Sequence, residues 1–212
     1  MKKTENTKIK QIIKQHILRN KKEYIIFSII FLIGIFLGVF FTNNMKQEQN
    51  AEVMNYFTSF IEKMKNIEKI DTGELLKSNL IKNTIFAVLL WFFGTTVIGL
   101  PVVFGLVMYR GFCIGYTISI VINVFGIVKG ISFILISLLL QNIIFIPSTI
   151  AIGVSGFKLY KSITQDKRKE NIKLEIIRHT LFSLLMLGFI LLSTIIDTFI
   201  STNLLKSTIK YF

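Results

Sequence analysis

Side chains that could carry out chemistry are few among the 212 residues, and they are scattered. General acid–base catalysis needs a positioned carboxyl group or histidine beside the reacting bond, yet the aspartates lie in polar segments or at the end of an apolar one (Asp71, Asp166 and Asp197). The serines of the apolar segments have no histidine near them in the sequence, so a nucleophile with its base is not indicated. We find no glycine loop of the kind that binds phosphate. We therefore expect no enzyme, no catalytic residue and no cofactor.

Metal ligands are equally sparse. Cys113 is alone and lies inside an apolar segment, and His16 and His179 flank apolar segments. One cysteine allows no disulfide within the chain, and this set is too small for a zinc cluster. We expect no metal site.

Two amides, Gln141 and Asn142, stand inside a long apolar segment. A polar amide in hydrocarbon is costly unless it is hydrogen-bonded, so we expect these side chains to bond to another helix, with Asn123 as one candidate partner. Such a pair serves either as structural glue between helices or as the lining of a pathway.

The segments that position these residues are hydrophobic. Hydrophobic residues make up 52% of the chain and charged residues 17%, and the charges fall into a few blocks. Uncharged runs of this length belong in lipid, because a surface helix needs polar residues at every turn. The sequence predicts a single all-α domain that spans the membrane about five times, at 24–41, 84–109, 111–128, 131–153 and 180–200.

Glycine and proline punctuate these spans. The second span contains Trp91, Gly94, Gly99 and Pro101, and proline removes a backbone donor, so we expect a kink or break near Gly99. That break marks either a functional site or a static packing kink. The fourth span also contains a proline, Pro147.

Small residues recur four apart in two spans, as Gly34 with Gly38 and as Gly111 with Gly115. This spacing lets two helices approach closely. In a chain with several spans it favours packing within the molecule over dimerisation, although an oligomer is possible.

Basic residues indicate the orientation. Eight lie in the leader at 1–22 and seven in the loop at 158–178, and we expect Arg110 in a short turn on the same side. Nine lie on the opposite side, where Lys129 marks a turn and where acidic residues balance most of the charge. The positive-inside rule then predicts a cytoplasmic amino terminus and an outward carboxyl terminus. The basic faces suit anionic lipid, and nucleic acid is not an expected partner.

The outward segment at 43–82 carries apolar residues at spacings of three and four, which predicts an amphipathic helix. Its stripe either packs on the protein's own spans and the outer leaflet or docks another extracytoplasmic protein. The candidate docking residues are Val53, Phe57, Phe60, Ile61 and Met64.

The order of motifs resembles that of the stage II sporulation protein M family. The matching residues are Asn83-Thr84, Trp91, Gly94, Ile98-Gly99-Leu100-Pro101, Gly111, Gly115, Gln141-Asn142 and Ile146-Pro147. The likeness covers nearly the whole chain. The chain departs from the family pattern at two places. Leu140 stands where sporulation-type members often have proline. Gln141-Asn142 and Phe145 stand where more distant relatives carry His-Gly and a downstream acid.

The resemblance implies a role in engulfment during endospore formation. Members of this family form a complex with two peptidoglycan hydrolases, stage II sporulation proteins D and P, and act as its non-catalytic scaffold in the mother-cell and septal membrane. The alternative from another class is a permease-like subunit, with the broken second span and Gln141 and Asn142 lining a solute path.

Overall fold

The computed structural model describes residues 2–66, 72–165 and 172–201, and within these ranges all regular structure is helical. The helices are α1 (Lys2–Arg19), α2 (Lys21–Asn43), α3 (Gln47–Asn66), α4 (Thr72–Gly94), α5 (Leu100–Ile134), α6 (Leu140–Gln165) and α7 (Ile172–Ile196). A π-helical segment, η1 (Leu135–Leu139), joins α5 to α6, and another, η2 (Asp197–Ser201), follows α7.

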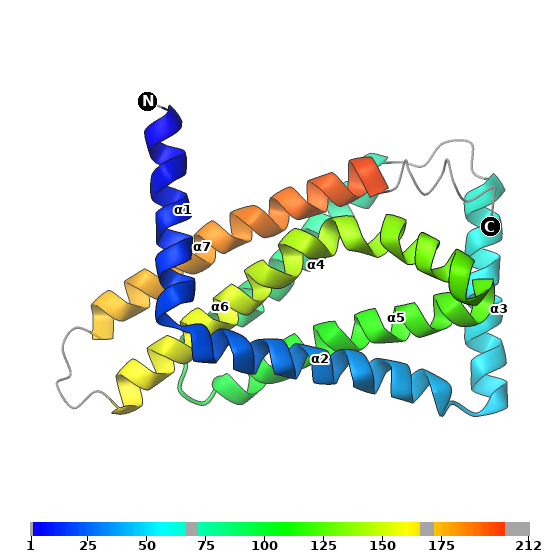
Figure 1. The fold of residues 1–212 in the computed structure, drawn as a ribbon, viewed down its shortest axis with the longest axis horizontal. Helices are drawn as coiled ribbons and strands as arrows, with labels where there is room; N and C mark the ends of the chain where they lie inside the picture. Colours follow the sequence, from blue (N-terminus) through cyan, green and yellow to red (C-terminus); the bar gives the residue numbers. More distant parts are fainter. Residues whose placement is uncertain (1, 67–71, 166–171, 202–212) are drawn as a thin grey trace.

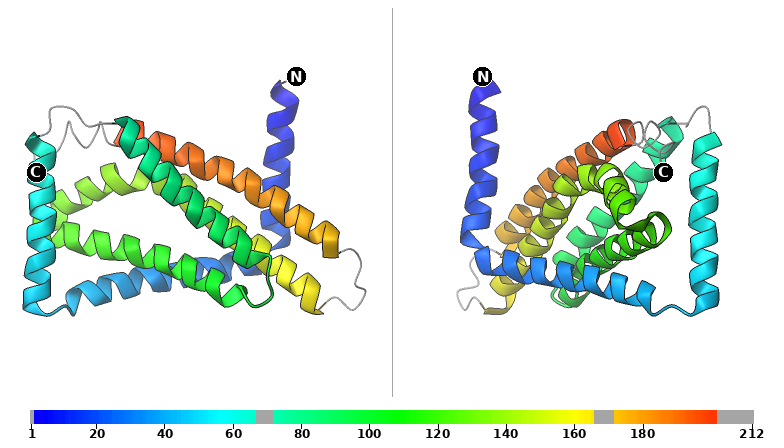
Figure 2. Two further views of the ribbon diagram at one scale, coloured as in Figure 1. Left: turned by 180° about the vertical axis from the view of Figure 1, so that it is seen from behind. Right: turned by 45° about the vertical axis from the view of Figure 1, so that its right-hand side comes forward.

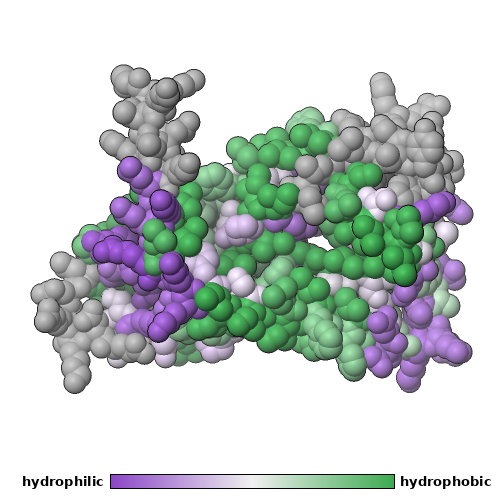
Figure 3. Space-filling model, viewed as in Figure 1, coloured by the Kyte–Doolittle hydropathy of each residue, from purple (hydrophilic) through white to green (hydrophobic). Residues whose placement is uncertain are grey.

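The long helices run between two ends of the molecule, and two amphipathic helices stand across these ends. In Figure 1, α2 and α5 lie along the long axis, while α1 crosses one end and α3 the other; Figure 2 shows the same arrangement from two further sides. We call these the α1 end and the α3 end. Five helices are long and apolar enough to cross a membrane, and hydrophobic side chains cover the middle of the face seen in Figure 3. The expected all-α, multi-pass membrane fold is confirmed.

The apolar core draws on every span. Phe27 of α2, Leu90 of α4, Val103 of α5, Phe145 of α6 and Ile190 of α7 are each fully buried in one cluster. Dispersion contacts at this density hold membrane helices together, because lipid tails provide no hydrophobic drive between them.

Glycines set the closest helix pair, α2 against α5. A side chain added at Gly34 or Gly38 would strike the α5 backbone, and one added at Gly111 or Gly115 would strike the α2 backbone. The two motifs thus face each other within one chain, which is the internal packing expected from their spacing.

The chain turns between the second and third spans at a different place from the one expected. α4 ends at Gly94 and α5 begins at Leu100, so the predicted spans 84–109 and 111–128 do not coincide with helices. Pro101 lies in the first turn of α5, where a missing N–H costs nothing. Of the kink or break expected near Gly99, the structure has the break: α4 ends completely, and the turn lies at 95–99. Arg110 lies inside α5, not in a turn.

A second reversal follows at Gly126. Its backbone is non-helical, with φ of 76° and ψ of 173°, and the chain beyond it doubles back, so that Gly130 packs against Ile122. Figure 1 shows α5 running to the α3 end and returning from it. This reversal lies beside Lys129, where the sequence predicts an outer turn.

Candidate functional site

The predicted docking stripe of α3 divides between two roles. Ile61 is 3% exposed and packs with Val121 and Phe133. The ring of Phe57 lies 6.0 Å from that of Phe125 and 6.2 Å from that of Phe133, measured between centroids. These two residues attach α3 to the reversal of α5, which is the packing alternative for the stripe.

The flank of the stripe remains open. Tyr56 is 78% exposed and Phe60, one turn later, is 47% exposed. Val53 is half-buried, and the side chain of Met64 lies outside the described part of the structure.

A groove of about 710 Å³ runs between this flank and α5. We call it the α3 groove, and its lining is Glu52, Val53, Tyr56, Phe57, Phe60, Tyr116, Thr117 and Ile120. Exposed tyrosine and phenylalanine beside a few polar groups are the composition of protein-binding hot spots. The groove can therefore receive an apolar or aromatic segment and fix its orientation by hydrogen bonds.

Arg110 is a polar feature of the bundle interior that the sequence analysis missed. It lies about 15 Å along α5 from Leu100, as the helical rise requires, and its guanidinium stands 4.2 Å from the ring centroid of Phe145. Asp197 of η2 lies within electrostatic range, and the Nε of Arg110 is buried without a hydrogen-bond partner in the described residues. An arginine between two uncharged runs was the one available signal. A charge at this depth is costly and is commonly functional.

The amides of α6 do not bond to another helix as expected. The Nδ2 of Asn142 donates to the carbonyl of Leu138 at 2.7 Å, inside its own segment. Its Oδ1 is buried and has no partner among the described residues, while Gln141 is half-buried. Asn123, the expected partner, is exposed. The acceptor for the Asn142 amide is thus a carbonyl of the π-helical turn η1, in place of a group on another helix.

A serine–histidine pair joins three helices near the α1 end. His179 is 2% exposed, its Nδ1 lies 2.9 Å from the Oγ of Ser155, and its Nε2 lies 3.3 Å from the carbonyl of Trp91. A carbonyl only accepts, so Nε2 carries the proton and Nδ1 accepts from Ser155. In this tautomer both ring nitrogens are satisfied and the imidazole ties α4, α6 and α7 together. Sequence reasoning missed the pair because its members stand 24 residues apart.

The remaining motif residues belong to helix contacts. The indole N–H of Trp91 donates to Thr180 at 3.1 Å, and Gly94 faces Gly156 so closely that a side chain would clash. Gly99 precedes α5, where its missing Cβ makes room for the carbonyl of Phe93. Pro147 lies inside α6. Among the described residues no three side chains of His, Cys, Asp and Glu gather to hold a metal ion.

Comparison with known proteins identifies the chain. The family model described as stage II sporulation protein M matches residues 27–202. That range covers the bundle, α3 and the Gly126 reversal. No curated protein and no solved structure matches significantly. The match spans most of the chain, and the protein belongs to the stage II sporulation protein M family.

Proposed function

We propose that this protein is a non-catalytic membrane scaffold of the engulfment machinery, which holds peptidoglycan hydrolases at the septal membrane of the mother cell. Family membership makes it a sporulation-related membrane protein. The observation that supports the scaffold role is the α3 groove, an open aromatic surface on a helix that stands across one end of the bundle. The proposed partners are stage II sporulation proteins D and P.

Charge supports the placement of this groove outside the cytoplasm. The basic leader and the basic loop at 158–178 both lie in or next to helices that meet at the α1 end. The shift of Arg110 into α5 removes one basic residue from that side and leaves the asymmetry intact. The positive-inside rule then puts the α1 end in the cytoplasm and α3 on the side of the peptidoglycan.

The way α3 is attached also suits docking. Phe57 and Ile61 anchor the helix on α5, so the groove is formed before a partner arrives. A preformed surface loses little conformational entropy on binding. Tyr56 and Phe60 then remain free to enter the partner's apolar pockets.

The test is co-purification of the hydrolases from sporulating cells in mild detergent. The double change Tyr56→Ser and Phe60→Ser should release both hydrolases, because hot-spot aromatics each contribute about 2 kcal/mol or more. The matched control, Asn55→Ala with Thr58→Ala, alters two exposed residues of the same helix outside the groove. It should retain the partners.

Two results would count against the scaffold proposal. Partners retained by the Tyr56 and Phe60 double variant would show that they dock elsewhere. Loss of the partners together with loss of membrane insertion would show instead that these aromatics only seat α3 at the bilayer surface. Immunoblotting of the membrane fraction separates release from failed insertion.

A second candidate function, a permease-like subunit, is favoured by Arg110. The turn at 95–99 lies at the α1 end, so the break in the expected second span does not line a path at mid-membrane. Arg110 offers a buried cation there instead, and the Oδ1 of Asn142, which has no partner among the described residues, lies three residues before Phe145. This candidate predicts anion flux into vesicles that Arg110→Leu abolishes. Vesicles with the unchanged protein that show no flux would exclude it.

A further inference from the structure

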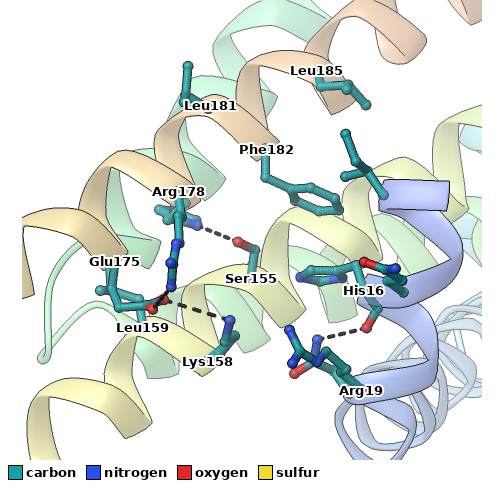
Figure 4. A pocket seen from close by; sticks show the side chains of 14 residues that line it. His16, Arg19, Ser155, Lys158, Leu159, Glu175, Arg178, Leu181, Phe182 and Leu185 are labelled. Carbon is teal, nitrogen blue, oxygen red and sulfur yellow. Dashed lines mark hydrogen bonds and ion pairs between the residues drawn. The ribbon is translucent and has the colours of Figure 1, made fainter. Parts of the chain in front are cut away.

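A pocket of about 420 Å³ opens at the α1 end, between α1, α6 and α7. Figure 4 shows Lys158 and Arg19 on one side of it, and Leu181 and Leu185 on the other. His16 and Phe182 lie between them with their rings stacked, 4.1 Å apart between centroids.

One side of the pocket is cationic. Lys158 lies 3.7 Å from the carboxylate of Glu175, and Arg178 pairs with that same carboxylate. Arg19 has no ion pair in the described part of the chain. The lining thus holds three basic side chains and one acid, Glu175, so the pocket carries an excess of positive charge.

The other side is apolar, and the order along α7 is informative. Glu175 and Arg178 come first from the α1 end, then Leu181 and Leu185 one to two turns deeper in the bundle. Leu181 is 62% exposed. A ligand that fills this pocket therefore meets charge at the molecule's end and hydrocarbon towards its middle.

A hydrogen-bond donor is also available. The Oη of Tyr24 lies 3.1 Å from the Nδ1 of His16. When that hydroxyl donates, Nε2 carries the imidazole proton. This Nε2 is buried and has no partner among the described residues. It is an unsatisfied donor in the wall of the pocket.

From this arrangement we infer that the pocket binds one anionic phospholipid, with the phosphate between Arg19, Lys158 and Arg178 and an acyl chain along Leu181 and Leu185. Free phosphate would satisfy the cations and leave the leucines uncovered. A zwitterionic lipid would carry its own cation into a site that already holds three. The order of charge and hydrocarbon along α7 matches that of a lipid in the leaflet at the α1 end.

The experiment is native mass spectrometry of the full chain, purified in detergent and mixed with phosphatidylglycerol or phosphatidylcholine. The unchanged protein should retain one phosphatidylglycerol in preference to phosphatidylcholine. The double variant Arg19→Gln with Lys158→Gln should weaken that retention roughly thirtyfold, given the usual contribution of a basic residue near an anionic surface. The control Lys14→Gln with Lys21→Gln removes two exposed charges from the same end outside the pocket. It should leave retention unchanged.

A second pocket variant distinguishes a loss of lipid binding from a loss of folding. Gln15 lines the pocket and is exposed, so Gln15→Glu adds a negative charge with little change of shape and should also lower retention. Equal losses in the control and in the pocket variants would overturn the inference, as would equal retention of the two lipids. Saturable binding of inorganic phosphate to the lipid-free protein, with the same dependence on Arg19 and Lys158, would assign the site to free phosphate instead.

Discussion

At the scale of single residues, Gly126 has the most demanding backbone. Its φ of 76° with ψ of 173° lies in a region that residues other than glycine rarely adopt, and nothing lies within 4 Å of where a Cβ would be. We predict that Gly126→Ala lowers the free energy of unfolding by about 1–3 kcal/mol, through strain alone. Thermal unfolding in detergent measures the change.

Gly105 provides the matched control for that prediction. It lies in the regular part of α5, and an added Cβ there would also meet nothing within 4 Å. Because alanine favours a helix by about 1 kcal/mol over glycine, Gly105→Ala should be neutral or stabilising. Equal losses at both positions would mean that the reversal at Gly126 does not depend on a left-handed backbone.

Arg110 shows where reading single residues fails. A charge between two uncharged runs usually marks the membrane surface, and this expectation placed a turn at 109–110. The structure instead covers the guanidinium with the ring of Phe145, a residue 35 positions further along the chain. A cation–π contact in a desolvated site is worth about 2 kcal/mol, and a partner so distant in sequence leaves no local pattern.

At the scale of elements, the sequence predicts close packing at the glycine pairs, and the structure shows that the two pairs meet in the seam between α2 and α5. Two glycine pairs four apart predict close approach, and each pair faces the other helix's backbone. We predict that Gly38→Val separates the helices and lowers the free energy of unfolding by about 1–3 kcal/mol, which is the usual cost of overpacking. Gly188→Val is the control, because a Cβ there meets nothing within 4 Å.

The end of α4 was less predictable. Gly99 and Pro101 mark a break in the helix, but the same residues fit a kink within one span and a turn between two. In the structure the helix ends at Gly94, and the hydroxyls of Thr95 and Thr96 bond the carbonyls of Phe92 and Phe93, which satisfies two of the last carbonyls of α4. Because α5 starts at Leu100, Arg110 lies ten residues inside the helix and not in the expected turn.

The contact of α1 with α7 should depend on pH. Burial, with a smaller contribution from Lys158 and then His179, lowers the pKa of His16 from 6.5 to about 4. The detached helix therefore binds a proton more readily than the docked one, so docking is strongest above about pH 6.5 and weakens as the pH falls towards 4. The protection factor of the α1 amides, which is the intrinsic exchange rate at each pH divided by the observed rate, should fall over that window.

The control for this prediction is His16→Phe. Phenylalanine keeps the stacking on Phe182 and has no titrating group, so the protection factors in α1 should stay constant between pH 6.5 and 4. An unchanged pH dependence in this variant would assign the effect to another group.

At the scale of the whole molecule, the sequence predicts the number of spans and the two amphipathic helices, because composition and periodicity are local. It leaves open what the α3 stripe covers. That depends on the Gly126 reversal, which brings Val121 and Phe133 together beneath Ile61. A glycine with positive φ has no signature that distinguishes it from the other glycines of the spans. The division of the stripe into an anchored edge and an open groove is visible only in three dimensions.

Orientation gives the last prediction, and it also tests the revised turn. If the basic residues hold the α1 end in the cytoplasm, a cysteine at Tyr56 should react with a membrane-impermeant maleimide on intact cells. A cysteine at Thr96, which is exposed in the turn at 95–99, should react only after permeabilisation. Cys113→Ser provides the background, and Val107→Cys, at a position buried in the core, should stay unreactive in both conditions. Labelling at Thr96 from outside would invert the topology and move the α3 groove into the cytoplasm, away from any peptidoglycan hydrolase. No labelling at Thr96 even after permeabilisation would return that turn to the membrane and restore a kinked span in place of the end of α4.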